Sequence, residues 1–181
     1  MLYADYMLAG KDAPTLLFYA HMDGQPVNAE LWEQDSPWQP VLKIEENDSW
    51  VEKPLSLLDK HYDPNWRIFA RSASDDKAPI MMLLAAINSL STNKVTPSVN
   101  IKVLLDSNEE GGSPTLAKVI EKNKAQLSAD AVVMLDGPMH PSNASTVVFG
   151  HRGATLVKLT VFGPNSDSHS GHFGNYIQNP A

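Results

Sequence analysis

Three short apolar runs, each followed at once by polar residues, limit the folds that this chain can adopt. They are residues 15–20 (TLLFYA), 99–105 (VNIKVLL) and 131–135 (AVVML). Apolar runs of this length are typical of strands that are buried on both faces of a sheet. Segments long enough for helices separate them. The pattern therefore predicts an α/β fold with a mostly parallel sheet flanked by helices.

The segments between these runs predict the remaining elements. Pro79 followed by an apolar stretch over 80–90 indicates a helix that begins near the proline, and a second helix is expected over about 114–123. Residues 67–70 favour a short strand. The prolines scattered through 24–66 disfavour long helices and central strands, so we expect an elaborated loop there with at most one hairpin.

The pattern changes near residue 149. Residues 156–162 (LVKLTVF) predict a strand of a different sheet, and the stretch that follows is rich in glycine and serine and holds two histidines. We therefore expect two domains, one over 1–148 and the start of another over 149–181.

Composition excludes several classes of protein. The formal net charge of -7 provides no positive field for phosphate groups, so nucleic acid is not an expected partner. The sequence has no apolar run of about 18 residues and no basic start followed by an apolar run, so neither a membrane nor export is expected. Cysteine is absent, which excludes disulfides, thiolate ligands and a cysteine nucleophile. A reducing cytoplasm fits this composition.

Metal-binding side chains gather where the predicted strands end. One imidazole and several carboxylates follow the apolar runs or lie at the first helix start: His21, Asp23, Asp75, Asp76, Glu109, Glu110 and Asp136. The carboxyl ends of parallel strands share one edge of a sheet, and so much negative charge at one edge requires cations. Each of these short motifs alone is more often a turn or a helix cap. Their joint order predicts divalent metal, and mixed His and carboxylate ligands suit zinc, with cobalt or manganese as alternatives.

These residues resemble the motifs of the M20 metallopeptidases. The motifs, in chain order, are 21–26 (HMDGQP), 71–79 (RSASDDKAP), 108–113 (NEEGGS) and 135–136 (LD), and 167–174 (DSHSGHFG) resembles the histidine motif of the family's lid or dimerisation domain. The resemblance implies an incomplete zinc-peptidase-like catalytic domain over 1–148. It also implies that 149–181 begin an α+β lid domain.

The resemblance also implies two bound divalent ions. His21 and Asp136 would hold the first ion, Asp75 would bridge both, and Glu110 would hold the second. The family completes the second site with a histidine from a C-terminal segment that these 181 residues do not include. We therefore expect this chain to correspond to the N-terminal part of such an enzyme, to bind one ion better than two, and to hydrolyse little by itself.

The catalytic roles follow from the same resemblance. Glu109 would be the general base toward a metal-bridged water, Asp23 would orient His21, and His169 would reach the substrate carbonyl, usually from a partner subunit. A cis peptide bond is expected between Asp75 and Asp76. The chain departs from the second motif at Ser72 and Ala78, where the family usually has glycine.

The implied function is a metal-dependent hydrolase that cleaves a peptide or acyl-amino bond. The form HSGHFGN of the lid motif favours the carnosinase-like dipeptidase branch and a homodimer, with a small peptide or an acylated amino acid as substrate. One alternative is a non-catalytic binding or subunit-association module, although retention of Asp23 and Glu109 argues against it. A serine hydrolase is disfavoured because the chain has no G-x-S-x-G elbow.

Overall fold

The computed structural model describes residues 1–174, 176 and 177. The chain divides into two compact units, Met1–Thr146 and a second unit that begins at Val147.

A four-stranded sheet forms the centre of the first unit. Its strands are β1 (Leu2–Tyr6), β2 (Thr15–His21), β6 (Asn100–Asp106) and β7 (Ala131–Met134), in the order β1-β6-β2-β7. β6, β2 and β7 run parallel, and β1 pairs antiparallel with β6. The predicted mostly parallel sheet is confirmed, with an additional antiparallel strand at one edge.

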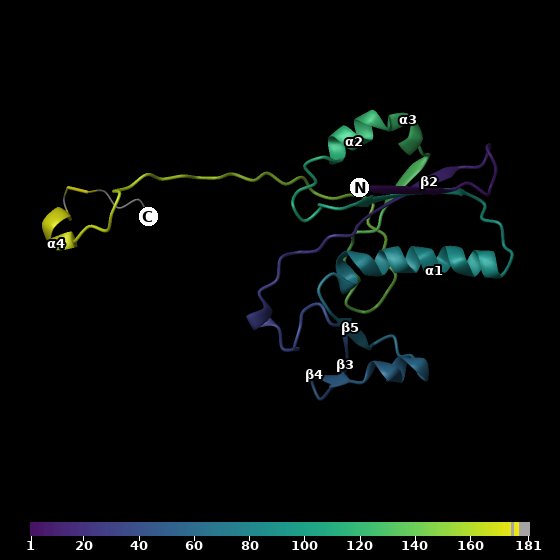
Figure 1. Ribbon diagram of the computed structural model, residues 1–181, viewed down its shortest axis with the longest axis horizontal. Coiled ribbons are helices and arrows are strands. Elements are labelled where there is room, and N and C mark those ends of the chain that lie inside the picture. Colours follow the sequence, from purple (N-terminus) through teal and green to yellow (C-terminus); the bar gives the residue numbers. More distant parts are fainter. Residues whose placement is uncertain (175, 178–181) are drawn as a thin grey trace. The chain divides into compact units, whose positions relative to one another are not determined.

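Helices cover both faces of this sheet. Figure 1 shows α1 (Ala78–Thr92) on one face, and α2 (Leu116–Lys122) with the short α3 (Lys124–Leu127) on the other. Pro79 lies in the first turn of α1, where its missing N–H removes no helical hydrogen bond. Leu17, Tyr19 and Leu104 pack with Leu127 in a buried apolar cluster between the sheet and α3. β2 and β6 thus supply the core as predicted, but the predicted burial of β7 is wrong, because this strand is mostly exposed.

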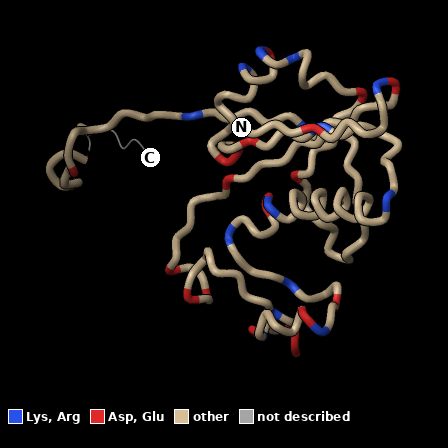
Figure 2. The backbone as a smooth tube through the Cα atoms, turned by 45° about the vertical axis from the view of Figure 1, so that its right-hand side comes forward, with Lys and Arg blue, Asp and Glu red and all other residues tan. Residues whose placement is uncertain are grey.

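A second sheet forms within the segment predicted to be an elaborated loop. Its strands are β3 (Val41–Glu46), β4 (Ser49–Lys53) and β5 (Arg67–Phe69), in the order β4-β3-β5, all antiparallel. Asn47 and Asp48 both have positive φ, at 51° and 61°, as the two-residue turn of a tight hairpin requires. Two short 3₁₀ helices flank the hairpin, η1 (Ala29–Leu31) and η2 (Leu55–Asp59). Basic and acidic positions are interspersed along this part of the chain (Figure 2).

The second unit contains one helical turn, α4 (Ser170–Phe173), within the part of it that the structure describes. The predicted strand over 156–162 is wrong, because residues 147–169 form neither helix nor strand. Leu156, Val157 and Leu159 are almost fully exposed. A strand needs a neighbour to accept and donate its backbone hydrogen bonds, and the described part of the second unit contains no strand that could provide one. No helix among the described residues is long and apolar enough to cross a bilayer.

Candidate metal centre

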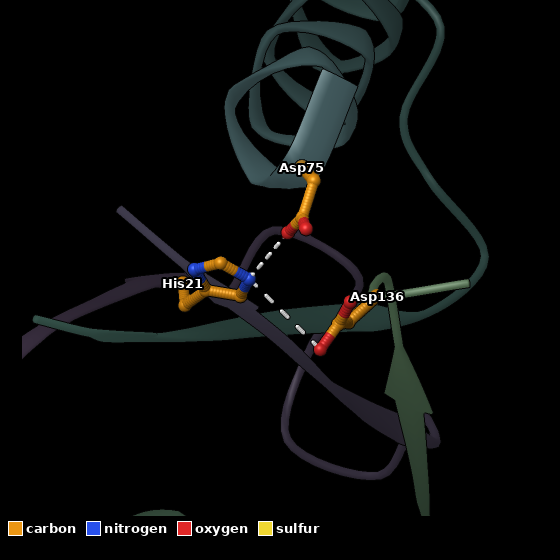
Figure 3. Close-up of side chains that lie close together, drawn as sticks. All are labelled: His21, Asp75 and Asp136. Carbon is orange, nitrogen blue, oxygen red and sulfur yellow. Dashed lines mark ion pairs between the residues drawn. The ribbon is translucent and has the colours of Figure 1, made fainter. Parts of the chain in front are cut away.

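His21, the last residue of β2, is the centre of the candidate site. Its side chain is 1% exposed, and its Nε2 atom lies 2.8 Å from Asp75 Oδ1 and 4.0 Å from Asp136 Oδ2. Ligand atoms of these three residues all lie within 4.8 Å of one another. Figure 3 shows both carboxylates pointing toward the same imidazole nitrogen. We call these three residues the His21 cluster.

The sheet explains why residues far apart in sequence meet here. Because β2, β6 and β7 run parallel, their carboxyl ends lie at one edge, with His21 opposite Asp106 in the register. The Leu135 N–H donates to the Tyr19 carbonyl at 2.8 Å, which holds the segment leading to Asp136 against β2. The edge predicted from the sequence is therefore where the cluster forms.

Asp75 reaches the cluster from the turn η3 (Ala73–Lys77), which precedes α1. Asp75 and Asp76 depart from helical backbone angles within this turn, and the peptide bond between them is cis, as expected. Asp76 is buried, and its Oδ2 atom accepts a hydrogen bond from the His21 backbone N–H at 3.0 Å. Asp76 thus ties η3 to the end of β2, a contact that the sequence did not predict.

Asp23 connects His21 to the turn over 108–113, which carries Glu109 and Glu110. Its Oδ1 atom lies 3.4 Å from His21 Nδ1. The same carboxylate accepts the Glu109 N–H and the Glu110 N–H, each at 3.1 Å. Glu109 Oε2 lies 3.9 Å from His21 Nε2. Asp23 therefore binds the backbone of this turn in addition to its predicted contact with the imidazole.

Glu110 and His169 lie outside the His21 cluster. The Glu110 carboxylate accepts a hydrogen bond from the Gln25 side chain. His169 belongs to the second unit, where it caps α4 and its Nδ1 atom accepts the Gly171 N–H at 3.0 Å. Their roles toward a second ion and toward the substrate therefore stay predictions.

The carboxylates of the site have no basic side chain as partner among the described residues. The Lys–carboxylate pairs of the structure join Lys43 to Glu33 and Lys53 to Glu46, both in the region of the second sheet. Lys77 donates to the Met22 carbonyl rather than to a carboxylate. Among the residues that the structure describes, His21 alone thus compensates the accumulated negative charge.

The pKa values of the site reflect this crowding. Burial raises the pKa of Glu109 above its ordinary value, and the charges of Asp136, Glu110 and Asp23 raise it further against the opposing effect of His21. Burial opposes a charged imidazole, yet Asp136, Asp76 and Asp75 together raise the pKa of His21. In both groups the neighbouring carboxylates contribute to the raised pKa.

The His21 cluster fits a divalent ion by the chemistry of its donors. One imidazole nitrogen and two carboxylates converge, and three such ligands are the usual protein contribution to a catalytic zinc. His21 Nδ1 is buried without a hydrogen bond of good geometry, although Asp23 lies beside it. Fixing the imidazole through this second nitrogen is how proteins orient a metal-binding histidine.

Gly24 allows the first and second motifs to approach each other. A Cβ atom at position 24 would lie 1.9 Å from Ser72 Oγ and 3.2 Å from Ser72 Cβ. Ser72 is itself buried, with φ of 62° and an Oγ atom that has no hydrogen-bond partner. We expect Gly24→Ala to destabilise the protein by about 1–3 kcal/mol, the usual cost of overpacking, as measured by denaturant unfolding.

The matched control for Gly24→Ala is the double variant with Ser72→Gly. Removing the Ser72 side chain leaves Arg71 Cδ, at 3.6 Å, as the nearest atom to the new methyl group. Ser72→Gly alone should stabilise the protein by about 1 kcal/mol, because it relieves a left-handed conformation and removes a buried hydroxyl without a partner. If the double variant is as unstable as Gly24→Ala, the close contact is not the cause.

Comparison with known sequences gives one consistent family. The profile of peptidase family M20/M25/M40 matches residues 17–170. The Cys-Gly metallodipeptidase dug1 of Schizosaccharomyces pombe is 30% identical over 168 residues, which is 92% of this chain and 31% of the relative. The human beta-Ala-His dipeptidase is 26% identical over 168 residues, 92% of this chain and 29% of the relative. The chain thus spans about a third of the length of these curated relatives.

Solved structures show the same fold. An M20 family metallo-carboxypeptidase from Sulfolobus solfataricus is 34% identical with a TM-score of 0.54, over 78% of this chain and 27% of that one. The dipeptidase Dug1p of Saccharomyces cerevisiae is 21% identical with a TM-score of 0.59, over 98% of this chain and 33% of that one. The second likeness concerns the fold alone.

Proposed function

This chain belongs to peptidase family M20/M25/M40, and we propose from this premise that the protein is a metal-dependent hydrolase of peptide or acyl-amino bonds. The observation that carries the proposal is the His21 cluster, with the Glu109 carboxylate 3.9 Å from the same imidazole nitrogen. A general base beside a divalent ion is the combination that amide hydrolysis requires.

His21, Asp75 and Asp136 would hold the first ion. Zinc is the metal we propose, because its preferred ligands match one imidazole and two carboxylates. A bound ion would polarise the scissile carbonyl and lower the pKa of a water molecule. Asp75 and Glu110 would take part in a second site, which we propose is completed by a residue beyond this chain.

The chain's own residues would perform the proton transfer and hold its geometry. Glu109 accepts the proton of the attacking water and passes it to the departing amine, for which a pKa above the ordinary Glu value is favourable. Asp23 orients His21 through its Nδ1 atom and holds the backbone of the turn that carries Glu109. His169, from a partner subunit of a homodimer, would stabilise the developing oxyanion.

Dipeptides are the substrates that we propose. Support comes from the relatives, which are described as Cys-Gly and beta-Ala-His dipeptidases. An acylated amino acid is the alternative within the same chemistry, because both substrates place an amide beside a free carboxylate. The cytoplasmic location inferred from the sequence stays a prediction.

The experiment that tests this function is hydrolysis with and without metal. Protein stripped by a chelator would be assayed against Cys-Gly, beta-Ala-His, a tripeptide and an N-acetylated amino acid, before and after zinc, cobalt or manganese is added. Both the 181-residue chain and any longer natural form would be measured, since we expect weak turnover from the chain alone. Turnover that is independent of metal in every form would contradict the proposal.

A further inference from the structure

Asp106, the last residue of β6, is a buried carboxylate that the proposed reaction does not use. It is 1% exposed and forms no ion pair with a lysine or arginine in the described part of the chain. Its Oδ2 atom accepts the Ser113 hydroxyl at 2.7 Å and the Tyr19 hydroxyl at 3.3 Å. Its Oδ1 atom accepts the Asn108 N–H at 3.0 Å. A buried charge held only by neutral donors calls for an explanation.

Two of these donors are the first and last residues of the turn over 108–113. The turn closes on itself, because the Ser113 N–H donates to the Asn108 carbonyl at 2.9 Å and the Gly112 N–H to the Glu109 carbonyl at 2.7 Å. Gly112 and Ser113 both have positive φ, at 84° and 48°. Asp106 thus binds both ends of a tightly specified loop whose middle carries Glu109.

Asp106 is itself fixed to the strand that carries His21. It lies opposite His21 in the parallel register, and its carbonyl accepts the Met22 N–H at 2.8 Å. Asp23 binds the Glu109 and Glu110 amides of the same turn. The turn is therefore connected to the end of β2 through two carboxylates, one at its ends and one at its middle.

The Asp106 carboxylate is suited to hold the turn in its ionised form. Burial alone would raise the pKa of Asp106, but hydrogen bonds from Ser113, Asn108 and Tyr19 outweigh it and hold the pKa below the ordinary value. The Tyr19 hydroxyl, on the strand that carries His21, is the donor of its hydrogen bond to Asp106. An ionised carboxylate can accept all three bonds at once, which an amide cannot.

We propose that Asp106, together with Tyr19 and Ser113, is a positioning element that fixes Glu109 relative to His21 by holding the 108–113 turn. This inference rests on the proposed function, in which Glu109 accepts the proton. Asp106 touches neither the substrate nor the ion and acts only through the turn. A misplacement of about 1 Å in a catalytic group can lower a rate by about 100-fold, so such an anchor has a measurable effect.

Asp106→Asn tests the proposal through two measurements. The amide has one accepting oxygen, and its NH₂ group would face donors, so at least one end of the turn is released. We expect hydrogen exchange of the amides over 108–113 to accelerate by roughly 10-fold or more, because the opening free energy of the turn falls. We expect kcat to fall by about 10- to 100-fold, with KM and zinc affinity within about 3-fold of wild type.

Asn100→Ala is the matched control, since Asn100 is equally buried on the same strand. Its side chain donates to the Gly10 carbonyl at 2.7 Å and accepts the Ala9 N–H at 3.2 Å, away from the turn. We expect this variant to be less stable overall, but we expect the hydrogen exchange of the 108–113 amides and kcat to stay as in the wild type. A loss of kcat equal to that of Asp106→Asn would overturn the proposal in favour of general destabilisation.

Ser113→Ala keeps the inference testable if Asp106→Asn does not fold. It removes the shortest hydrogen bond to Asp106 and should give a smaller increase in exchange and a smaller loss of kcat than Asp106→Asn. In the double variant Asp106→Asn with Ser113→Ala, kcat should be no lower than in Asp106→Asn alone, because both changes remove the same contact. Unchanged exchange and unchanged kcat in folded variants would overturn the anchor. Faster exchange of the turn in Asp106→Asn, in a protein whose wild type hydrolyses nothing either as the 181-residue chain or in any longer natural form, would instead remove the proposed function and leave the anchor in place.

Discussion

Zinc affinity is expected to fall by roughly 100-fold or more when His21 is replaced by alanine. His21 provides the one imidazole of the cluster, and both carboxylates converge on its Nε2 atom. Mutation of a residue that only orients a metal ligand lowers metal affinity by about 10- to 100-fold. Loss of a ligand itself should therefore lower zinc affinity by about 100-fold or more. Calorimetric titration of zinc into chelator-treated protein measures the effect.

Thermal unfolding provides a second readout of His21→Ala. An ion present at 100 times its dissociation constant stabilises the folded state by about 2.7 kcal/mol, and we expect this stabilisation in the wild type but not in the variant. His61→Ala is the matched control, since the His61 ring packs against Trp66 and lies outside the cluster. Equal zinc binding by wild type and His21→Ala would show that the cluster is not the metal site.

The parts of the fold that the sequence predicted are those set by local apolar pattern. β2 and β6 come from mostly apolar runs and are largely buried, as their composition predicts, whereas β7 comes from an equally apolar run but is mostly exposed. β1 was missed because its residues, LYADY, are mostly exposed and contain an aspartate. An edge strand of this kind is defined by its pairing with β6, which is a long-range contact without a local signal.

The second sheet was only partly predictable for a related reason. Proline marks where strands end but not which strands pair, and β5 joins the hairpin across the intervening η2 segment. The run over 156–162 shows the opposite case. Its composition is that of a strand, but composition cannot supply the neighbour on which a strand depends.

In the site, the sequence predicted which residues meet but not what holds them. His21, Asp75 and Asp136 converge as the parallel order implies. Asp106 was given no role, and Asp76 was placed only among the acidic side chains of the edge and in the expected cis peptide bond, although each is a buried carboxylate that accepts hydrogen bonds near the cluster. Asp106 directly follows an apolar run, so the strand-end signal that selected His21 and Asp136 also applied to it. What was lacking was the identity of its donors, which only the folded turn reveals.

Glu109→Gln is expected to lower kcat by about 100- to 10,000-fold, the usual contribution of a general base, while zinc affinity changes little. Gln retains the size and shape of the side chain but cannot accept a proton. Glu109 lies beside His21 and is not among the three converging ligands, so the ion should still bind. Steady-state kinetics and zinc titration on the same preparation separate the two effects.

Glu110→Gln is the matched comparison, because it makes the same chemical change one residue along the turn. We expect it to alter the number of ions bound or the affinity for a second ion, since the proposal gives Glu110 a role as ligand rather than base. Both backbone amides donate to Asp23, so neither substitution removes the contacts that hold the turn. If Glu109→Gln instead releases zinc and Glu110→Gln abolishes turnover with zinc still bound, the two glutamates have exchanged roles, and the proton acceptor is the one that lies against Gln25.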